Sequence, residues 1–219
     1  MTDTLTFHTH PMSRARIARW MLEETGLAYE EVVHDYGAAM KSPEYLAINP
    51  MGKVPALEHG DVVITENAAI CAYLADLVPE KGLAPPPGSP ERGSYYRWLF
   101  FLAGPVESLV TAKHAGALAP AINAGYGTEA DVLRTLEGAV AGRKHLAGDG
   151  FTAADLYMAA FLGYYLRIGA IEPRPAFVEF AQRHATRPAA LAANARDDAL
   201  VAAHPHPGMP GASQAQGAQ

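Results

Sequence analysis

The sequence contains a single cysteine, Cys71, among 219 residues. One cysteine cannot form an internal disulfide, so the fold must depend on its apolar core, and a reducing compartment is expected. Basic residues are also few, since 17 Lys and Arg are set against 23 Asp and Glu, for a formal net charge of −6. Nucleic-acid binding requires a clustered basic surface, so polyanionic partners are disfavoured.

The sequence also lacks recognisable targeting and membrane signals. Residues 1–8 lack the basic start and the apolar run of a signal peptide. No apolar stretch approaches the length that spans a membrane, so we expect a cytoplasmic protein without membrane contact. Apolar residues are nevertheless abundant: they make up 49% of the chain, which suffices for the core of one large domain or two small ones.

The first eighty residues alternate between strand-like and helix-like patterns. Residues 5–9 place Leu5, Phe7 and Thr9 on one face, which predicts a strand. Further elements are expected as a helix over 13–25, a strand over 28–36, a hairpin over 54–65 and a helix over 66–77. This order predicts a small α/β domain.

A segment rich in proline and glycine separates this region from the rest. Residues 79–93 hold five prolines and three glycines and cannot continue a helix. Every later pattern is helical: 95–110 with a kink at Pro105, 129–146, 153–168, 175–185 and 188–200. The predicted organisation is an α/β domain over 1–79, a linker over 80–93, an all-helical domain over 94–204 and a disordered tail over 205–219.

Val54 and Pro55 open a predicted strand within "GKVPAL" (52–57). A proline at this point can be cis at a cost of about 0.5–1 kcal/mol. A cis bond would turn the N–H and C=O of Val54 outward, where an extended peptide could pair with them. An ordinary trans proline is the alternative.

Glu66 and Asn67 stand where the predicted hairpin meets a helix. Asn67 is a good N-cap, the free N–H groups of the first turn form an anion site, and Glu66 can accept a ligand ammonium group. Together they could hold the zwitterionic end of an amino acid, although a plain helix cap is the alternative. Another cap is predicted at Thr152 and Asp155, with Phe151 as a hydrophobic staple, and we interpret it as structural.

In three motifs the chain resembles the cytosolic glutathione transferases, and bacterial members in particular. The motifs are "INPMGKVPAL", "ITENAAICAYL" and "FTAADLYMA", in this order, and the resemblance covers roughly residues 3–200. It implies a thioredoxin-like N-terminal domain and an all-α C-terminal helical bundle. It also implies a homodimer that uses glutathione as a co-substrate and has no prosthetic group.

The resemblance assigns roles to individual residues. Pro55 would be the family's cis proline, and Val54 the backbone partner of the cysteinyl residue of glutathione. Glu66 and Asn67 would hold the γ-glutamyl end, although the family usually has Ser or Thr at the position of Asn67. The residues that could face the glycyl carboxylate are Lys53, Asn49 and Lys41.

A hydroxyl near the end of the first strand would stabilise the glutathione thiolate. Lowering a thiol pKa from about 8.5 by two units requires about 2.7 kcal/mol. One charge-assisted hydrogen bond beside a helix N-terminus is of that size. Thr9 is preferred, because in serine-using relatives the active hydroxyl often lies two residues before a proline, as Thr9 does before Pro11. Ser13 is the alternative, and it could instead only cap the helix.

No tyrosine or cysteine occurs in this loop, so the implied mechanism is of the serine/threonine type. His10 is a candidate general base, although an exposed loop histidine is the simpler interpretation. Neither the pair His8 and His10 nor the pair His204 and His206 has a third ligand nearby, so no metal is expected. Cys71 is expected to be an inert core thiol.

The expected function is detoxifying conjugation of the glutathione thiolate to small hydrophobic electrophiles. The helix over 95–101 and the segment Pro105 to Lys113 would line the electrophile pocket. Two alternatives fit the same fold: a glutathione-dependent disulfide or peroxide reductase, and a non-catalytic protein that binds glutathione or an apolar ligand.

Overall fold

A four-stranded mixed sheet organises the N-terminal part of the chain. The computed structural model describes residues 4–203, so the predicted tail lies outside it. The strand order is β2-β1-β3-β4. β1 (Leu5–Thr9) pairs parallel with β2 (Tyr29–Val33) and antiparallel with β3 (Ala56–His59), which forms the predicted hairpin with β4 (Val62–Thr65).

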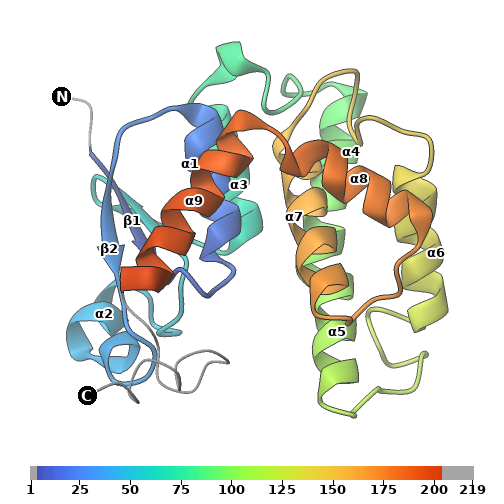
Figure 1. The fold of residues 1–219 in the computed structure, drawn as a ribbon, viewed down its shortest axis with the longest axis horizontal. Coiled ribbons are helices and arrows are strands. Elements are labelled where there is room, and N and C mark those ends of the chain that lie inside the picture. The colour runs from blue at the N-terminus through green and yellow to red at the C-terminus, as the bar shows by residue number, and fades with distance from the viewer. Residues whose placement is uncertain (1–3, 204–219) are drawn as a thin grey trace, which may run out of the picture.

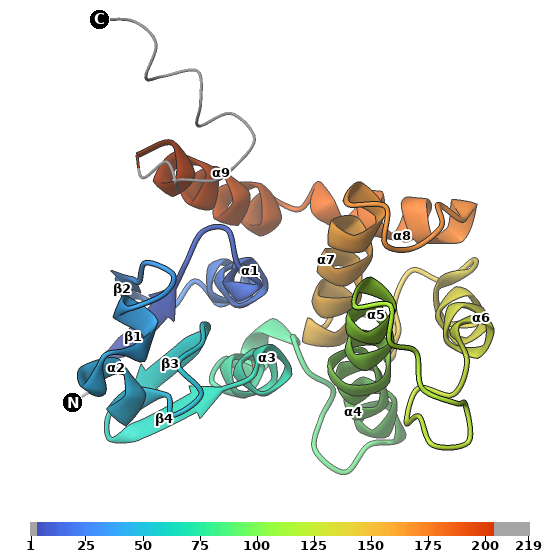
Figure 2. The ribbon, with the colours of Figure 1, turned by 90° about the horizontal axis from the view of Figure 1, so that it is seen from below.

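Two helices lie between the sheet and the helical domain (Figure 2). They are α1 (Ala15–Thr25) and α3 (Asn67–Asp76). Phe7 and Leu57 of the strands are fully buried in the core that these helices cover, because alternation along a strand turns every second side chain to the same face. The βαβαββα order and the mixed sheet confirm the predicted thioredoxin-like domain.

One helix of this domain is absent from the sequence prediction. α2 (Pro43–Ile48) follows a 3₁₀ turn at 39–41 and begins after Ser42, whose hydroxyl accepts the N–H of Tyr45 at 3.2 Å. Pro43 at the first helical position and Glu44 in the first turn are typical start signals. Six residues are too few to show a helical period, so the sequence pattern does not predict this helix.

The helical domain begins inside the predicted linker. α4 (Pro90–Phe101) starts at Pro90 because the Ser89 hydroxyl accepts the N–H of Arg92 at 3.2 Å. A π-helical segment, Leu102–Val106, joins it to α5 (Glu107–His114) and contains Pro105. Proline lacks an N–H and clashes with the preceding turn, which accounts for the irregularity predicted there.

Three further helices complete this domain, with α7 against both α4 and α8 (Figure 1). They are α6 (Glu129–Val140), α7 (Ala153–Arg167) and α8 (Pro175–Ala185). α6 ends before the predicted residue 146, because Gly142 has a φ of 67° and the helix stops at Val140. α7 begins with the predicted capping box. No helix within residues 4–203 is long and apolar enough to cross a membrane.

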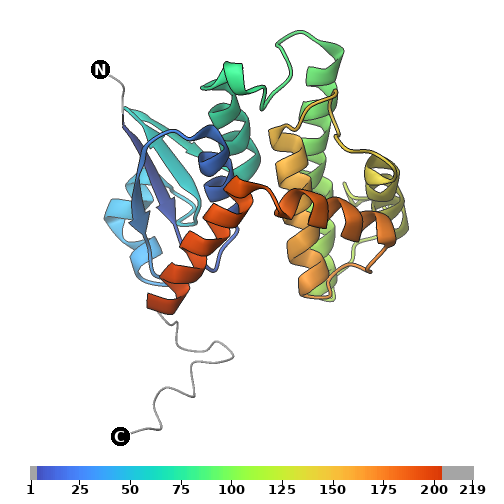
Figure 3. The same ribbon diagram turned by 45° about the horizontal axis from the view of Figure 1, so that its top comes forward.

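The last helix crosses back to the N-terminal domain. α9 (Pro188–Ala203) follows α8 after a short connection and packs along α1 (Figures 1 and 3). Arg19 of α1 is fully buried, and its Nε donates to Oδ1 of Asp197 in α9 at 2.8 Å. Arg19 also forms an ion pair with Glu31 of β2. A buried cluster of charges therefore fastens α9 to the sheet domain.

Candidate functional site

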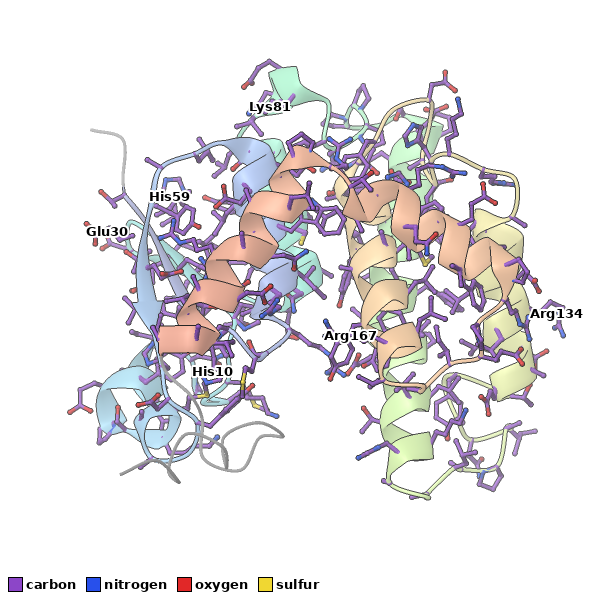
Figure 4. All side chains as sticks on the ribbon, in the orientation of Figure 1. His10, Glu30, His59, Lys81, Arg134 and Arg167 are labelled. Atoms are coloured by element: carbon purple, nitrogen blue, oxygen red, sulfur yellow. The ribbon has the colours of Figure 1, made fainter. Side chains whose placement is uncertain are left out.

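A cavity of about 1720 Å³ lies between the two domains. Sites for one small molecule usually measure roughly 300–1,000 Å³, so this cavity has room for two ligands. We call its lining residues from 12–67 the sheet wall and those from 103–201 the helical wall. Figure 4 marks His10 in the N-terminal domain and Arg167 in the helical domain. The predicted site residues in the sheet wall are Ser13, Lys41, Asn49, Lys53, Val54, Pro55, Glu66 and Asn67.

Val54 presents an open backbone to the cavity. The Val54–Pro55 peptide bond is cis, as predicted. Pairing between β1 and β3 stops at Ala56, opposite His8, so Val54 lies just beyond the end of the ladder. Within residues 4–203, its N–H and C=O make no hydrogen bond with another backbone group. An extended peptide can therefore pair with both.

The loop before Pro55 is held by its own hydrogen bonds. The carbonyl oxygen of Lys53 accepts from the hydroxyl of Tyr45 and from Nδ2 of Asn49, both at 2.7 Å. Oδ1 of Asn49 accepts the N–H of Met51 at 3.1 Å. The side-chain amide of Asn49, expected near a ligand carboxylate, thus braces the loop at both of its ends.

Two ammonium groups lie along this loop. Nζ of Lys41 donates to the carbonyl of Met51 at 2.7 Å and passes over Gly52. A Cβ on Gly52 would lie 2.3 Å from the carbonyl oxygen of Met40, and its φ is 56°, so only glycine fits. The side chain of Lys53 is exposed and forms no ion pair with the part of the protein described. This end of the sheet wall therefore offers positive charge to an anion.

Glu66 holds a strained backbone at the start of α3. Its φ of 68° is the one positive value of a non-glycine residue in the described chain. Such strain costs about 1–3 kcal/mol and is concentrated at functional sites. Glu66, not Asn67, is the N-cap of α3, because Asn67 already has helical geometry. Nδ2 of Asn67 donates to the carbonyl of Arg14 at 3.1 Å, and its Oδ1 is buried without a hydrogen-bond partner among residues 4–203.

The two candidate hydroxyls occupy different environments. Thr9 is fully buried on the core face of β1 with Phe7, and it is not among the residues of the cavity wall. Ser13 lines the cavity, and its Oγ donates to the carbonyl of His10 at 2.7 Å and accepts the N–H of Ala15 at 3.0 Å. Ser13 also lies just before α1, where the helix N–H groups carry partial positive charge.

His8 in β1 and His10 just after it are both buried. His10 is only 5% exposed, so the expectation of an exposed loop histidine is wrong. Its Nδ1 accepts the N–H of Met12 at 3.1 Å, and its ring lies 4.1 Å from that of Tyr36. His8 is 3% exposed and is hydrogen-bonded to Glu58 at 2.6 Å. Neither histidine is part of the cavity wall.

Cys71 and the tail histidines complete the set of predicted candidates. Cys71 is fully buried in α3, and burial raises the pKa of its thiol to about 12. The thiol is therefore protonated at neutral pH, in agreement with an inert core cysteine. His204 and His206 lie outside the described residues.

A polar cluster that the sequence did not indicate joins the two walls. Arg14 forms an ion pair with Glu107 of α5 and donates to the hydroxyl of Tyr165 in α7. That hydroxyl donates to Oε2 of Glu107 at 2.9 Å, and burial together with the Glu107 charge raises the pKa of Tyr165. The three residues come from separate elements, so no local motif could reveal them. Within Pro105 to Lys113, only Glu107 lines the cavity.

Two family models match the chain. Residues 3–76 match the glutathione S-transferase N-terminal domain, and residues 101–188 match the C-terminal domain of the same family. Both matches follow the division between the sheet domain and the helical domain.

Curated relatives match over most of the chain. Glutathione S-transferase GST-4.5 of Xanthomonas campestris pv. campestris is 32% identical over 161 residues, which cover 70% of this chain and 76% of the relative. Glutathione S-transferase 3 of Zea mays is 31% identical over 215 residues, which cover 88% and 90%.

Solved structures agree with these matches. A glutathione transferase from Methylococcus capsulatus is 28% identical with a TM-score of 0.76, covering 90% of this chain and all of its own. A sphingomonad glutathione S-transferase, complexed with glutathione, is 31% identical with a TM-score of 0.71 and covers 88% and 98%.

Proposed function

Because the chain belongs to the glutathione S-transferase family, we propose that it conjugates the glutathione thiolate to small hydrophobic electrophiles in a detoxifying reaction. The observation that carries this proposal is that one cavity is lined by Ser13, Val54 and Glu66 together. The glutathione complex of the sphingomonad relative supports the choice of co-substrate. Membership of this family also favours a cytoplasmic location for the chain.

Glutathione would lie along the sheet wall in an extended conformation. Its cysteinyl backbone would pair with the open N–H and C=O of Val54, as an added strand does. Its γ-glutamyl end would meet Glu66 and the first N–H groups of α3, where a carboxylate is stabilised and an ammonium group finds a carboxylate. Its glycyl carboxylate would face Lys53 and Lys41.

Ser13, in place of Thr9, is the hydroxyl we assign to the thiolate, which makes the enzyme a serine type. Only Ser13 lines the cavity, and its hydroxyl can exchange the carbonyl of His10 for the sulfur. A hydrogen bond to a charged group contributes about 1.5–3 kcal/mol, against about 0.5–1.5 kcal/mol for a neutral one. Moving the Ser13 hydrogen bond from the His10 carbonyl to the sulfur therefore stabilises the thiolate relative to the neutral thiol.

The electrophile would occupy the helical wall. Tyr164 and Ile168 of this wall are 40% and 53% exposed, so they offer apolar surface to a second ligand. The Arg14 cluster adds a polar group to the cavity next to Ser13.

Three assays on the same protein test the function. We expect turnover of a chromogenic aryl halide with glutathione, weak turnover of a disulfide substrate, and glutathione binding by calorimetry. Disulfide or peroxide turnover alone would favour a reductase. Glutathione binding without turnover in either assay would favour a binding protein.

A homodimer is the proposed assembly. Apolar side chains are exposed on β4, where Val62 is 58% exposed, and on α4, where Tyr96 and Phe100 are 39% and 66% exposed. β4 and α4 lie on the same side of the molecule (Figure 2). Sedimentation velocity should show a dimer. Phe100→Glu should weaken it, whereas Leu191→Glu, at an exposed residue of α9, should leave it intact. A monomeric wild-type protein would refute the assembly.

A further inference from the structure

Three side chains that can ligate a metal converge in the helical domain. His145 lies in the connection from α6 to α7, Asp155 in the first turn of α7, and His184 in the last turn of α8. Each offers one ligand atom, and these atoms lie within 4.8 Å of one another. Asp155 is fully buried and His184 is 3% exposed. None of the three lines the cavity, so the cluster is separate from the glutathione site.

One nitrogen of this cluster has no partner in the described structure. Nδ1 of His145 is buried, and no donor or acceptor among residues 4–203 reaches it. Leaving a buried polar atom unpaired costs about 1–3 kcal/mol. A buried, unpartnered ring nitrogen beside a carboxylate and a second imidazole is therefore an independent sign of a missing ligand.

The tautomer of His184 suits a metal ligand. Nε2 of His184 lies 3.1 Å from the carbonyl oxygen of Lys144. A carbonyl oxygen can only accept, so Nε2 carries the proton and Nδ1 has the lone pair. Metal-binding histidines commonly donate their other N–H to a backbone carbonyl in this way.

The Asp155 carboxylate is fixed in position and still has coordinating capacity. Oδ2 accepts the N–H and the hydroxyl of Thr152, both at 2.8 Å. Oδ1 accepts only the N–H of Leu146, at 2.7 Å, so one lone pair on Oδ1 stays available. Hydrogen-bonded carboxylates of this kind are typical ligands, because their orientation is set before the ion arrives.

We propose that His145, Asp155 and His184 bind a divalent first-row transition ion, with Zn²⁺ as the preferred ion. Two imidazoles and one carboxylate suit zinc, whereas Mg²⁺ and Ca²⁺ prefer oxygen ligands alone. Tetrahedral ligands at about 2.0–2.2 Å from zinc lie roughly 3.4 Å apart, so binding draws the three atoms closer together. A water molecule would complete the coordination.

The surroundings are compatible with a bound cation. Rings of Phe180 and Phe151 lie 4.6 and 5.2 Å from the His184 ring and keep this side of the cluster dry. Arg183 and Arg187 are nearby positive charges that could oppose a cation. Each is paired with a carboxylate: Arg183 with Glu179, and Arg187 through Nε and Nη2 with Glu24, at 2.6 and 2.8 Å. The ion would tie the α6–α7 connection to the start of α7 and the end of α8.

The test uses protein in which His204→Ala and His206→Ala remove the two histidines near the chain end, so that they cannot contribute to metal binding. After treatment with a chelator, Zn²⁺ is titrated by calorimetry and Co²⁺ by visible absorption, which reports tetrahedral ligands. His145→Ala and His184→Leu each remove one ligand, and His114→Ala removes an exposed histidine of α5 as the matched control. Asp155 is left unchanged because it caps α7.

We expect one ion per chain and a loss of more than about tenfold in affinity in either ligand variant, with no change in His114→Ala. Saturating Zn²⁺ should also raise the Tm by roughly 5–10 °C in the parent protein and in His114→Ala, but not in the two ligand variants. Absence of one-to-one binding, or equal binding in His145→Ala, would overturn the proposal. His145 is half-buried and bears no internal hydrogen bond, so its variant decides the question even where His184→Leu does not fold.

Discussion

The two walls of the cavity are built from different parts of the polypeptide. The sheet wall presents backbone groups whose positions are set by hydrogen bonds, such as the carbonyl of Lys53, and by an unusual conformation, as at Glu66. The helical wall presents side chains, with α7 as the largest contributor, and the cluster of Arg14, Glu107 and Tyr165 joins it to the sheet wall. Backbone groups do not change when a side chain is substituted, so a wall made of them suits a single fixed ligand. A wall made of side chains changes with each substitution, so it can suit different ligands. A substitution in one wall should therefore change the binding of one ligand and leave the binding of the other unchanged.

The largest effect is expected where α9, part of the helical wall, is fastened to the sheet domain. Arg19→Met should lower the free energy of unfolding by about 3–5 kcal/mol, because it leaves Asp197 and Glu31 buried without their cation. Urea denaturation measures this loss. Arg196→Met is the control, since Arg196 is exposed and lies 3.5 Å from Glu31, and it should cost less than about 1 kcal/mol. Equal losses would show that α9 is not held by the buried charges.

The next effect concerns the hydroxyl of the sheet wall. Ser13→Ala should raise the pKa of the bound thiol by up to about two units and lower kcat/KM by up to about a hundredfold at neutral pH, since about 2.7 kcal/mol of stabilisation is lost. A titration of thiolate absorbance measures the pKa. Thr9→Val, which keeps the buried shape, should leave it unchanged. A shift in Thr9→Val alone would return the role to Thr9.

Glu66→Gln should weaken glutathione binding by about ten- to a hundredfold, because the ligand ammonium group loses a charged partner worth about 1.5–3 kcal/mol. Calorimetry with glutathione measures the affinity. Glu30→Gln is the control, as Glu30 is an exposed residue at the outer edge of the sheet (Figure 4). Unchanged affinity in Glu66→Gln would remove Glu66 from the site.

The smallest effect is expected in the helical wall. Ile168→Ala removes apolar surface worth about 1 kcal/mol, so KM for an aryl halide should rise by less than about tenfold. Glutathione affinity should stay the same. Leu191→Ala, an exposed α9 residue outside the cavity, should change neither value. If Ile168→Ala weakens glutathione instead, the division between the two walls does not hold.

The sequence predicts the sheet wall better than the helical wall, for physical reasons. Pro55 and Glu66 stand in contiguous motifs that set their local conformation, and both line the cavity. Thr9 shows that a spacing of two residues before a proline does not place a hydroxyl in the cavity wall. Its alternation with Phe7 places it on the core face, and it does not line the cavity.

Long-range contacts are what a single sequence does not reveal. Arg19 lies on the apolar side of α1 and would be expected at the surface, yet it is fully buried because carboxylates from β2 and α9 reach it. The cluster of Arg14, Glu107 and Tyr165 likewise combines three distant segments. Nothing local distinguishes these residues from ordinary surface charges.

The pairing of Arg19 with Asp197 has a consequence for how the protein matures on the ribosome. The two residues are 178 positions apart, so the guanidinium emerges long before its carboxylate is synthesised. N-terminal domains generally fold first during synthesis, and in this one Arg19 has only Glu31 as an ion-pair partner until Asp197 is made. The buried charge cluster is therefore completed only after α9 has been synthesised.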